Sequence, residues 1–148
     1  GLEAEIKASY YPVFGVYDSG GKFTGIKFNG VPGGHEINSF IIALYNTAGP
    51  GQQISAETLD KLASIDKKAK IQVGISLSCT LCPEVVMASQ LIALKNSNVE
   101  AEMIDVANYS EFKNEHSIMS VPAIVINGGD VIFGKKSLDE LVELVKKA

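Results

Sequence analysis

The segment KIQVGISLSCTLCPEVV, residues 70–86, joins an alternating apolar run to the only two cysteines of the chain. Within residues 70–77 every second side chain is apolar, which is the period of a β-strand. The run ends just before Cys79, and Pro83 directly follows Cys82. Proline is favoured in the first turn of a helix, where its missing N–H costs no hydrogen bond. The sequence therefore predicts a strand, a Cys-x-x-Cys turn and a helix in direct succession.

The pattern on either side of this segment predicts an α/β domain. The expected elements are a helix over residues 55–65, a helix over 83–94, a strand over 99–106, a short helix over 109–116, a β-hairpin around Gly128-Gly129 and an amphipathic helix that opens with a capping box at 137–140. Strand, helix and strand in this order form a parallel βαβ unit, with the cysteines at the strand-to-helix turn.

The first fifty residues repeat the order of elements found at the end of the chain, a proline followed by a hairpin and a helix. Pro12 precedes two apolar runs separated by a Gly-Gly pair, and a helix with apolar positions at i, i+3, i+4 and i+7 follows from about Glu36. The same order occurs after Pro122. We interpret this as an internal duplication in which residues 1–50 form a degenerate half copy without cysteines and residues 51–148 form the complete domain.

Composition narrows the class of protein. The chain has 148 residues, of which 46% are hydrophobic and 20% charged, as is typical of a folded globular protein. Its net charge of -4 argues against nucleic acid as a partner, because phosphate binding requires clustered positive charge. No apolar run reaches the roughly eighteen residues of a membrane-spanning helix, and the start shows no secretory signal, so we expect a cytoplasmic protein. The start at Gly1 rather than Met fits a fragment of a longer protein.

The cysteine spacing points to thiol chemistry, with two alternatives left open. At the N-terminus of a helix, Cys79 meets free N–H groups and the positive end of the helix dipole, both of which stabilise a thiolate. Cys82, one turn further on, is placed to attack a mixed disulfide formed on Cys79. The alternatives are inert buried thiols and a soft-metal (copper or zinc) site. For a metal, only His35 and His116 are available as further imidazole ligands, and neither shows ligand spacing.

These motifs resemble a known family. CTLCP at 79–83, followed by SVPAIVING and a closing helix, is similar to thioredoxin- and glutaredoxin-like domains. The resemblance is stronger to the N-terminal tandem thioredoxin-like domain of the flavoprotein component of bacterial alkyl hydroperoxide reductases. The segment SLSCTLCPEVV at 76–86 and the Gly-His-Glu sequence at 34–36 carry this stronger resemblance.

The resemblance implies a three-layer thioredoxin-like fold and a role in electron transfer. A redox-active Cys79–Cys82 disulfide would relay electrons from a flavoprotein disulfide reductase to a partner disulfide, for which a peroxiredoxin is a candidate. Cys79 would be the nucleophile and Cys82 the resolving thiol, and Glu36 would exchange a proton with the pair. No cofactor is expected on this chain, because it has no G-x-G-x-x-G after a strand, and flavin and NAD(P)H would belong to a separate reductase module.

The resemblance also implies a partner-binding rim around the cysteines. Val121-Pro122 would form an X–cis-Pro pair facing them, and Thr80 and Leu81 lie between them. Thr80 and Leu81 are uncharged and leave the direction of exchange open. Besides the metal-binding module, a docking module with incidental cysteines remains an alternative.

Three groups of charged residues also have simpler interpretations. Glu36 can be a first-turn acid favoured by its helix dipole. We interpret Asp105 as a solvated strand end rather than a buried acid near the cysteines. Lys67, Lys68 and Lys70 are expected to form a solvated turn.

Overall fold

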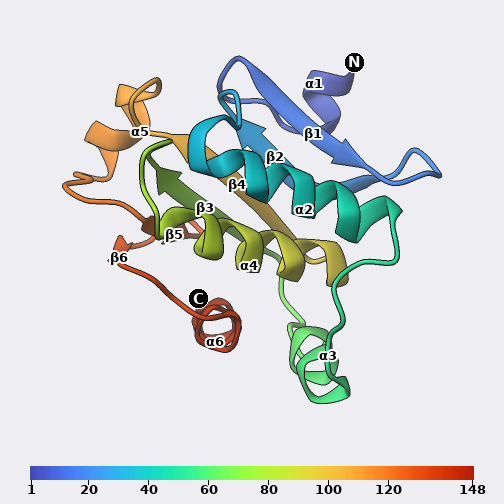
Figure 1. Cartoon of the computed structure of the whole chain (residues 1–148). Helices are drawn as coiled ribbons and strands as arrows, with labels where there is room; N and C mark the ends of the chain where they lie inside the picture. Colours follow the sequence, from blue (N-terminus) through green and yellow to red (C-terminus); the bar gives the residue numbers. More distant parts are fainter.

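The computed structural model describes all residues from 1 to 148 and is built on one six-stranded mixed sheet (Figure 1). The strands are β1 (Val13–Tyr17), β2 (Phe23–Asn29), β3 (Ala69–Ile75), β4 (Val99–Asp105), β5 (Ala123–Ile126) and β6 (Ile132–Phe133), in the spatial order β1-β2-β4-β3-β5-β6. β4 pairs in parallel with both β2 and β3, and the other neighbours are antiparallel. The first fifty residues thus share a continuous sheet with the rest of the chain.

Seven short helical segments surround the sheet. They are α1 (Leu2–Glu5), the 3-10 turn η1 (Gly34–Glu36), α2 (Ile37–Ala48), α3 (Ala56–Ala63), α4 (Cys82–Lys95), α5 (Ser110–Glu115) and α6 (Leu138–Lys147). α4 contacts α2 on one side and α6 on the other, so these three helices cover one face of the sheet (Figure 1). The predicted elements agree with the structure to within a few residues, and α1 is an addition that the sequence pattern did not predict.

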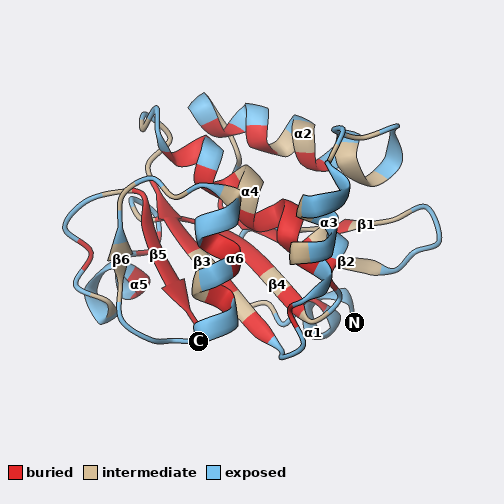
Figure 2. Ribbon diagram, turned by 90° about the horizontal axis from the view of Figure 1, so that it is seen from below, coloured by how far each residue is buried: buried red, intermediate tan, exposed pale blue.

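The core lies between the sheet and this helical layer. Alternate residues of β3, from Ile71 to Ile75, are fully buried and pack against the apolar face of α4 (Figure 2). Pro83 at the start of α4 is buried without losing a hydrogen bond, as its first-turn position allows. The β3–α4–β4 unit is therefore well packed, and it holds the segment between β3 and α4 in a defined place.

The opposite face of the sheet is partly polar. α5 covers one end of it with a small apolar cluster that includes Phe112. Beside this cluster Lys27 and Glu102 form a buried ion pair with a distance of 3.6 Å between Nζ and Oε2. Lys70 donates to the same Glu102 carboxylate at 2.8 Å, so it belongs to this network rather than to a solvated turn, whereas Lys67 and Lys68 are exposed as predicted.

The prediction that Asp105 is a solvated strand end was wrong. Its side chain is buried, and its carboxylate accepts hydrogen bonds from the N–H of Ala107 and the amide of Asn108. Asp105 thus closes the turn after β4, a common use of aspartate where a strand ends in a tight turn.

None of the helices combines the length and the apolar character that a membrane-spanning helix requires.

Candidate functional site

The two cysteines lie where β3 gives way to α4, and the structure holds them in unlike surroundings. Cys79 is in the turn and half-buried, whereas Cys82 is the first residue of α4 and has no exposed surface. They form a disulfide with Cα atoms 5.6 Å apart, a usual separation for such a bond. Only Cys79 can be reached by a reagent from outside, as the role of nucleophile requires. The burial of Cys82 fits the role of resolving thiol.

The backbone around Cys79 favours a negatively charged sulfur. The N–H of Cys82 points at Cys79 Sγ, with 3.2 Å between nitrogen and sulfur. This N–H is one of the unpaired donors at the start of α4, where the helix dipole places positive charge. When the disulfide is opened, the same N–H stabilises a Cys79 thiolate, the reactive form of cysteine.

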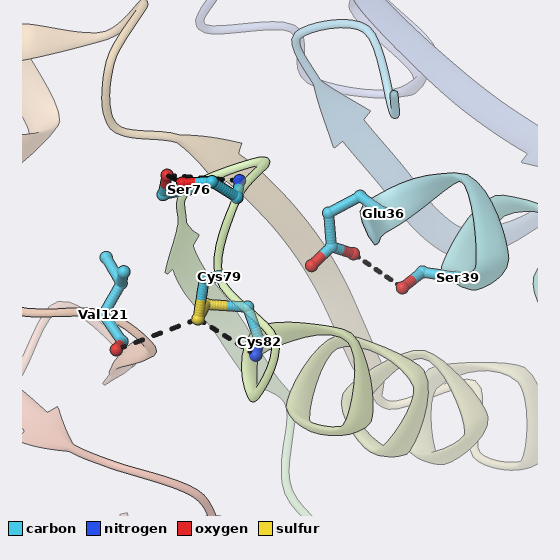
Figure 3. Close-up of a disulfide and its surroundings, with 7 residues drawn as sticks. Glu36, Ser39, Ser76, Cys79, Cys82 and Val121 are labelled. Atoms are coloured by element: carbon cyan, nitrogen blue, oxygen red, sulfur yellow. Dashed lines mark hydrogen bonds between the residues drawn. A yellow bond between two sulfur atoms is a disulfide. The ribbon is translucent and has the colours of Figure 1, made fainter. Parts of the chain in front are cut away.

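The Val121–Pro122 segment faces the disulfide from the other side. The peptide bond between these residues is cis, and the carbonyl oxygen of Val121 lies 4.0 Å from Cys79 Sγ (Figure 3). Pro122 is buried, Val121 is half-buried, and Thr80 and Leu81 are exposed beside Cys79. The structure therefore brings all four residues of the predicted partner-binding rim together around one sulfur atom.

Glu36 reaches this site from the first fifty residues. The backbone N–H of His35 donates to the carbonyl oxygen of Leu77 at 2.9 Å, which fastens η1 to the segment that leads into Cys79. Gly34 has a φ of +52°, and a Cβ at this position would lie 2.5 Å from the Leu77 oxygen. Glycine is thus required here for the close approach. Figure 3 shows the Glu36 carboxylate directed toward the cysteines from the start of α2.

The Glu36 carboxyl group is fully buried, unlike an ordinary first-turn acid. Its Oε2 accepts a hydrogen bond of 2.6 Å from Ser39 Oγ, and its Oε1 has no hydrogen-bond partner. Burial raises the pKa of Glu36 to about 7, against the opposing effect of the Ser39 hydrogen bond. A carboxyl group in this state exchanges protons near neutral pH, which is the property that acid–base chemistry requires.

Reasoning from sequence missed Ser39. The signal was present as a glutamate followed three residues later by a serine, a spacing that puts the two side chains on one face of a helix. The imidazole rings of the two histidines do not join the cysteines in a metal-binding group. His35 is exposed, and the His116 ring contacts the Phe112 ring at 4.8 Å between centroids. No group of three or more histidine, cysteine, aspartate or glutamate side chains is arranged to hold a metal ion.

Comparisons with known proteins agree with this geometry. A family model described as Thioredoxin domain matches residues 69–146. The alkyl hydroperoxide reductase AhpF of Staphylococcus aureus is 32% identical over 122 residues, and a protein of Bacillus subtilis called NADH dehydrogenase is 33% identical over the same length. Each alignment covers 82% of this chain and 24% of the relative, so the chain spans about a quarter of the curated relatives it matches.

Solved structures support the same assignment. AhpF of Enterococcus faecalis, in the structure of a point mutant, superposes with a TM-score of 0.93 at 42% identity, covering 97% of this chain and 69% of that one. A protein disulfide oxidoreductase from Aeropyrum pernix has the same fold, with a TM-score of 0.82 at 24% identity, covering 97% of this chain and 62% of that one. The chain belongs to the thioredoxin domain family and is similar over nearly its whole length to the N-terminal part of the alkyl hydroperoxide reductase AhpF.

Proposed function

We propose that this chain is a relay domain that passes electrons from a flavoprotein disulfide reductase to the disulfide of a partner protein, with a peroxiredoxin as the candidate partner. The observation that carries the proposal is the asymmetric cysteine pair, in which Cys79 is accessible and Cys82 is fully buried beneath it. This asymmetry defines which sulfur meets the partner and which one releases it. The similarity to AhpF supports the choice of partners.

The reaction is a pair of thiol–disulfide exchanges. The Cys79 thiolate attacks one sulfur of the partner disulfide, forms a mixed disulfide and expels the other partner sulfur as a thiolate, which takes up a proton. Cys82 then loses its proton and attacks Cys79 Sγ, which forms the Cys79–Cys82 disulfide, breaks the mixed disulfide and releases the second partner sulfur as a thiolate, which takes up a proton from water. The two cysteines give up two electrons and two protons, and the partner gains two electrons and takes up two protons from water.

Glu36 takes the proton of Cys82 in the second exchange. Its carboxylate is directed toward the cysteines and is fully buried, as is Cys82 (Figure 3). A pKa of about 7 lets Glu36 accept a proton from a thiol without a large free-energy penalty. In the reverse reaction, when the reductase opens the disulfide, Glu36 returns the proton to Cys82.

Contact with the partner is assigned to the rim formed by Thr80, Leu81, Val121 and Pro122. Leu81 offers exposed apolar surface next to Cys79, and the carbonyl oxygen of Val121 is available to an extended partner segment. Flavin and NAD(P)H are assigned to a separate reductase module. Residues 1–50 act as a degenerate half copy whose task is to supply Glu36, and residues 51–148 supply the disulfide. The cytoplasmic location stays a prediction.

Trapping the mixed disulfide tests this function. Cys82→Ser removes the resolving thiol, so the reduced variant should form a stable adduct with a partner disulfide through Cys79. We expect peptide mapping after incubation with glutathione disulfide to find one glutathione on Cys79 in nearly every molecule. The matched control is Cys79→Ser, in which the buried Cys82 should react far more slowly.

Two results would contradict the proposal. Equal labelling of Cys79 and Cys82 in the two single variants would remove the assigned roles. A native mass that shows a metal ion bound in molar amount to the reduced wild-type chain, and lost in either variant, would favour the metal-binding module instead.

A further inference from the structure

We propose that Ser39 is a positioning residue for Glu36, holding one carboxylate oxygen so that the other faces the cysteines and receives the proton of Cys82. The inference rests on the proposed function, in which Glu36 is the proton acceptor. The hydroxyl of Ser39 donates to Glu36 Oε2 at 2.6 Å, and both residues have no exposed surface. Figure 3 shows the carboxylate between Ser39 and the disulfide, with its second oxygen on the side of the cysteines.

The chemistry of the bond fixes which oxygen takes the proton. Ser39 Oγ uses its single hydrogen on Oε2, while the buried Oε1 has no partner. When Oε1 takes up a proton, Oε2 becomes a carbonyl oxygen and still accepts from the same hydroxyl. The hydrogen bond thus persists in both protonation states of Glu36, and the carboxyl group need not rotate between them.

Helix capping does not account for Ser39. In α6, Ser137 is the N-cap and Glu140 is the third helical residue, and the two form a capping box at the surface. In α2 the same two residue types stand in exchanged places, with Glu36 as N-cap and Ser39 as third residue, and no side chain caps the helix. The Ser39 hydroxyl therefore serves the carboxylate rather than the backbone.

In the disulfide form, no charged group contributes to the pKa of Glu36. α4, which packs against η1, brings Cys82 and Glu84, whose carboxylate is paired with Lys135, and the turn before α4 brings Cys79. The turn over residues 76–78 brings only neutral side chains, and His35 on η1 itself is exposed. Burial and the Ser39 hydrogen bond are the causes that set the pKa of Glu36.

The experiment measures the protonation of the Glu36 carboxyl group in the reduced full chain. We would measure the titration midpoint of the Glu36 carboxyl carbon by 13C NMR, together with the rate of glutathione disulfide reduction from pH 5 to 9. In Ser39→Ala the carboxylate loses its one hydrogen bond, so the midpoint should rise by about one pH unit and the rate at pH 7 should fall by up to about tenfold. Ser39→Thr keeps the hydroxyl and should stay near the wild type in both.

Ser89→Ala is the matched control, because Ser89 is also buried but its hydroxyl donates only to the Val86 carbonyl oxygen. We expect it to leave the midpoint and the pH profile unchanged. Should Ser39→Ala fail to fold, Ser39→Val, which has the shape of Ser39→Thr without its hydroxyl, has the same expected result. Adding Ser39→Ala to Glu36→Gln should slow the exchange no further.

The outcomes separate this inference from the proposed function. Suppose that Glu36→Gln abolishes the inflection of the pH–rate profile near neutral pH, while Ser39→Ala leaves the Glu36 titration midpoint and the exchange rate at wild-type values. The positioning role of Ser39 is then wrong, and the role of Glu36 stands. If Glu36→Gln keeps the wild-type pH profile, the proton transfer to Glu36 is wrong and the positioning role falls with it. Ser39→Ala slowing Glu36→Gln as much as it slows the wild type would also overturn the inference.

Discussion

At the scale of single residues, Glu36 shows how burial creates a reactive group from an ordinary one. Water stabilises an exposed carboxylate, whereas the interior offers Glu36 only the hydroxyl of Ser39. The charged form is therefore disfavoured, and the pKa of Glu36 rises to about 7. The same penalty that makes Glu36 a useful proton acceptor reduces the stability of the folded chain at high pH.

Glu36→Gln should therefore change how stability depends on pH. The folded-state pKa of about 7 lies above the ordinary value of 4.5, so the folded chain binds the Glu36 proton more tightly between these values. Relative to Glu36→Gln, the oxidised wild type should lose stability as pH rises from 4.5 to 7 and lose no more above that. At about 1.4 kcal/mol per pKa unit the loss is about 3 kcal/mol. Urea unfolding of both variants at pH 4.5, 7 and 8.5 measures it, and a pH-independent difference would contradict it.

At the scale of elements, the site depends on one close approach between two turns. η1 comes from the first fifty residues, and the turn after β3 carries Cys79. They meet where the His35 N–H donates to the Leu77 carbonyl oxygen. Only glycine fits at Gly34, because of its positive φ and the nearby Leu77 oxygen. The element that bears the acid is thereby fixed against the element that bears the thiols.

Gly34→Ala should separate these two elements. The added Cβ would lie 2.5 Å from the Leu77 oxygen, so η1 must shift away from the cysteines. We expect a loss of about 1–3 kcal/mol in the free energy of unfolding, and a slower exchange at pH 7, because Glu36 moves with η1. Gly33→Ala is the control, since a Cβ there meets nothing within 4 Å. Wild-type exchange rates in Gly34→Ala would show that the contact does not place Glu36.

At the scale of the whole molecule, a buried ion pair fastens the start of the chain to the sheet. Lys27 on β2 lies beside Glu102 on β4 and donates to the carbonyl oxygens of Ile6 and Lys7. Burial lowers the pKa of Lys27. Burial alone would raise the pKa of Glu102, but hydrogen bonds and charges from its lysine and amide neighbours outweigh it and keep the pKa below its usual value. The network joins β2, β4 and the N-terminal segment into one unit.

Lys27→Met should destabilise this unit strongly. The substitution leaves the Glu102 carboxylate without one of its cations and leaves two backbone carbonyls without their donor, at a cost of about 3–5 kcal/mol. The control is Lys7→Met, which removes a shorter but exposed ion pair of 2.8 Å with Glu100 and should cost less than about 1 kcal/mol. Urea unfolding at pH 7 compares the two, and equal losses would contradict the importance of burial here.

Local sequence determined several elements, including the strand and the helix on either side of the cysteines. Three features involve only residues close together in the sequence, so the sequence pattern alone predicts them. They are the alternation in β3, the first-turn Pro83 of α4 and the capping box of α6. The fold class and the roles suggested for Cys79 and Cys82 followed from these elements together with the family resemblance.

Tertiary structure decided the surroundings of the reacting groups. The burial of Glu36 depends on η1 meeting a turn some forty residues later in the chain, and the burial of Asp105 and the pairing of Lys70 with Glu102 depend on the neighbouring strand. A charged residue has the same letter in the sequence whether it is solvated or buried. Its pKa and its partners are set by residues brought close only when the sheet and helices pack, and these contacts make Glu36, with Ser39 behind it, part of the site.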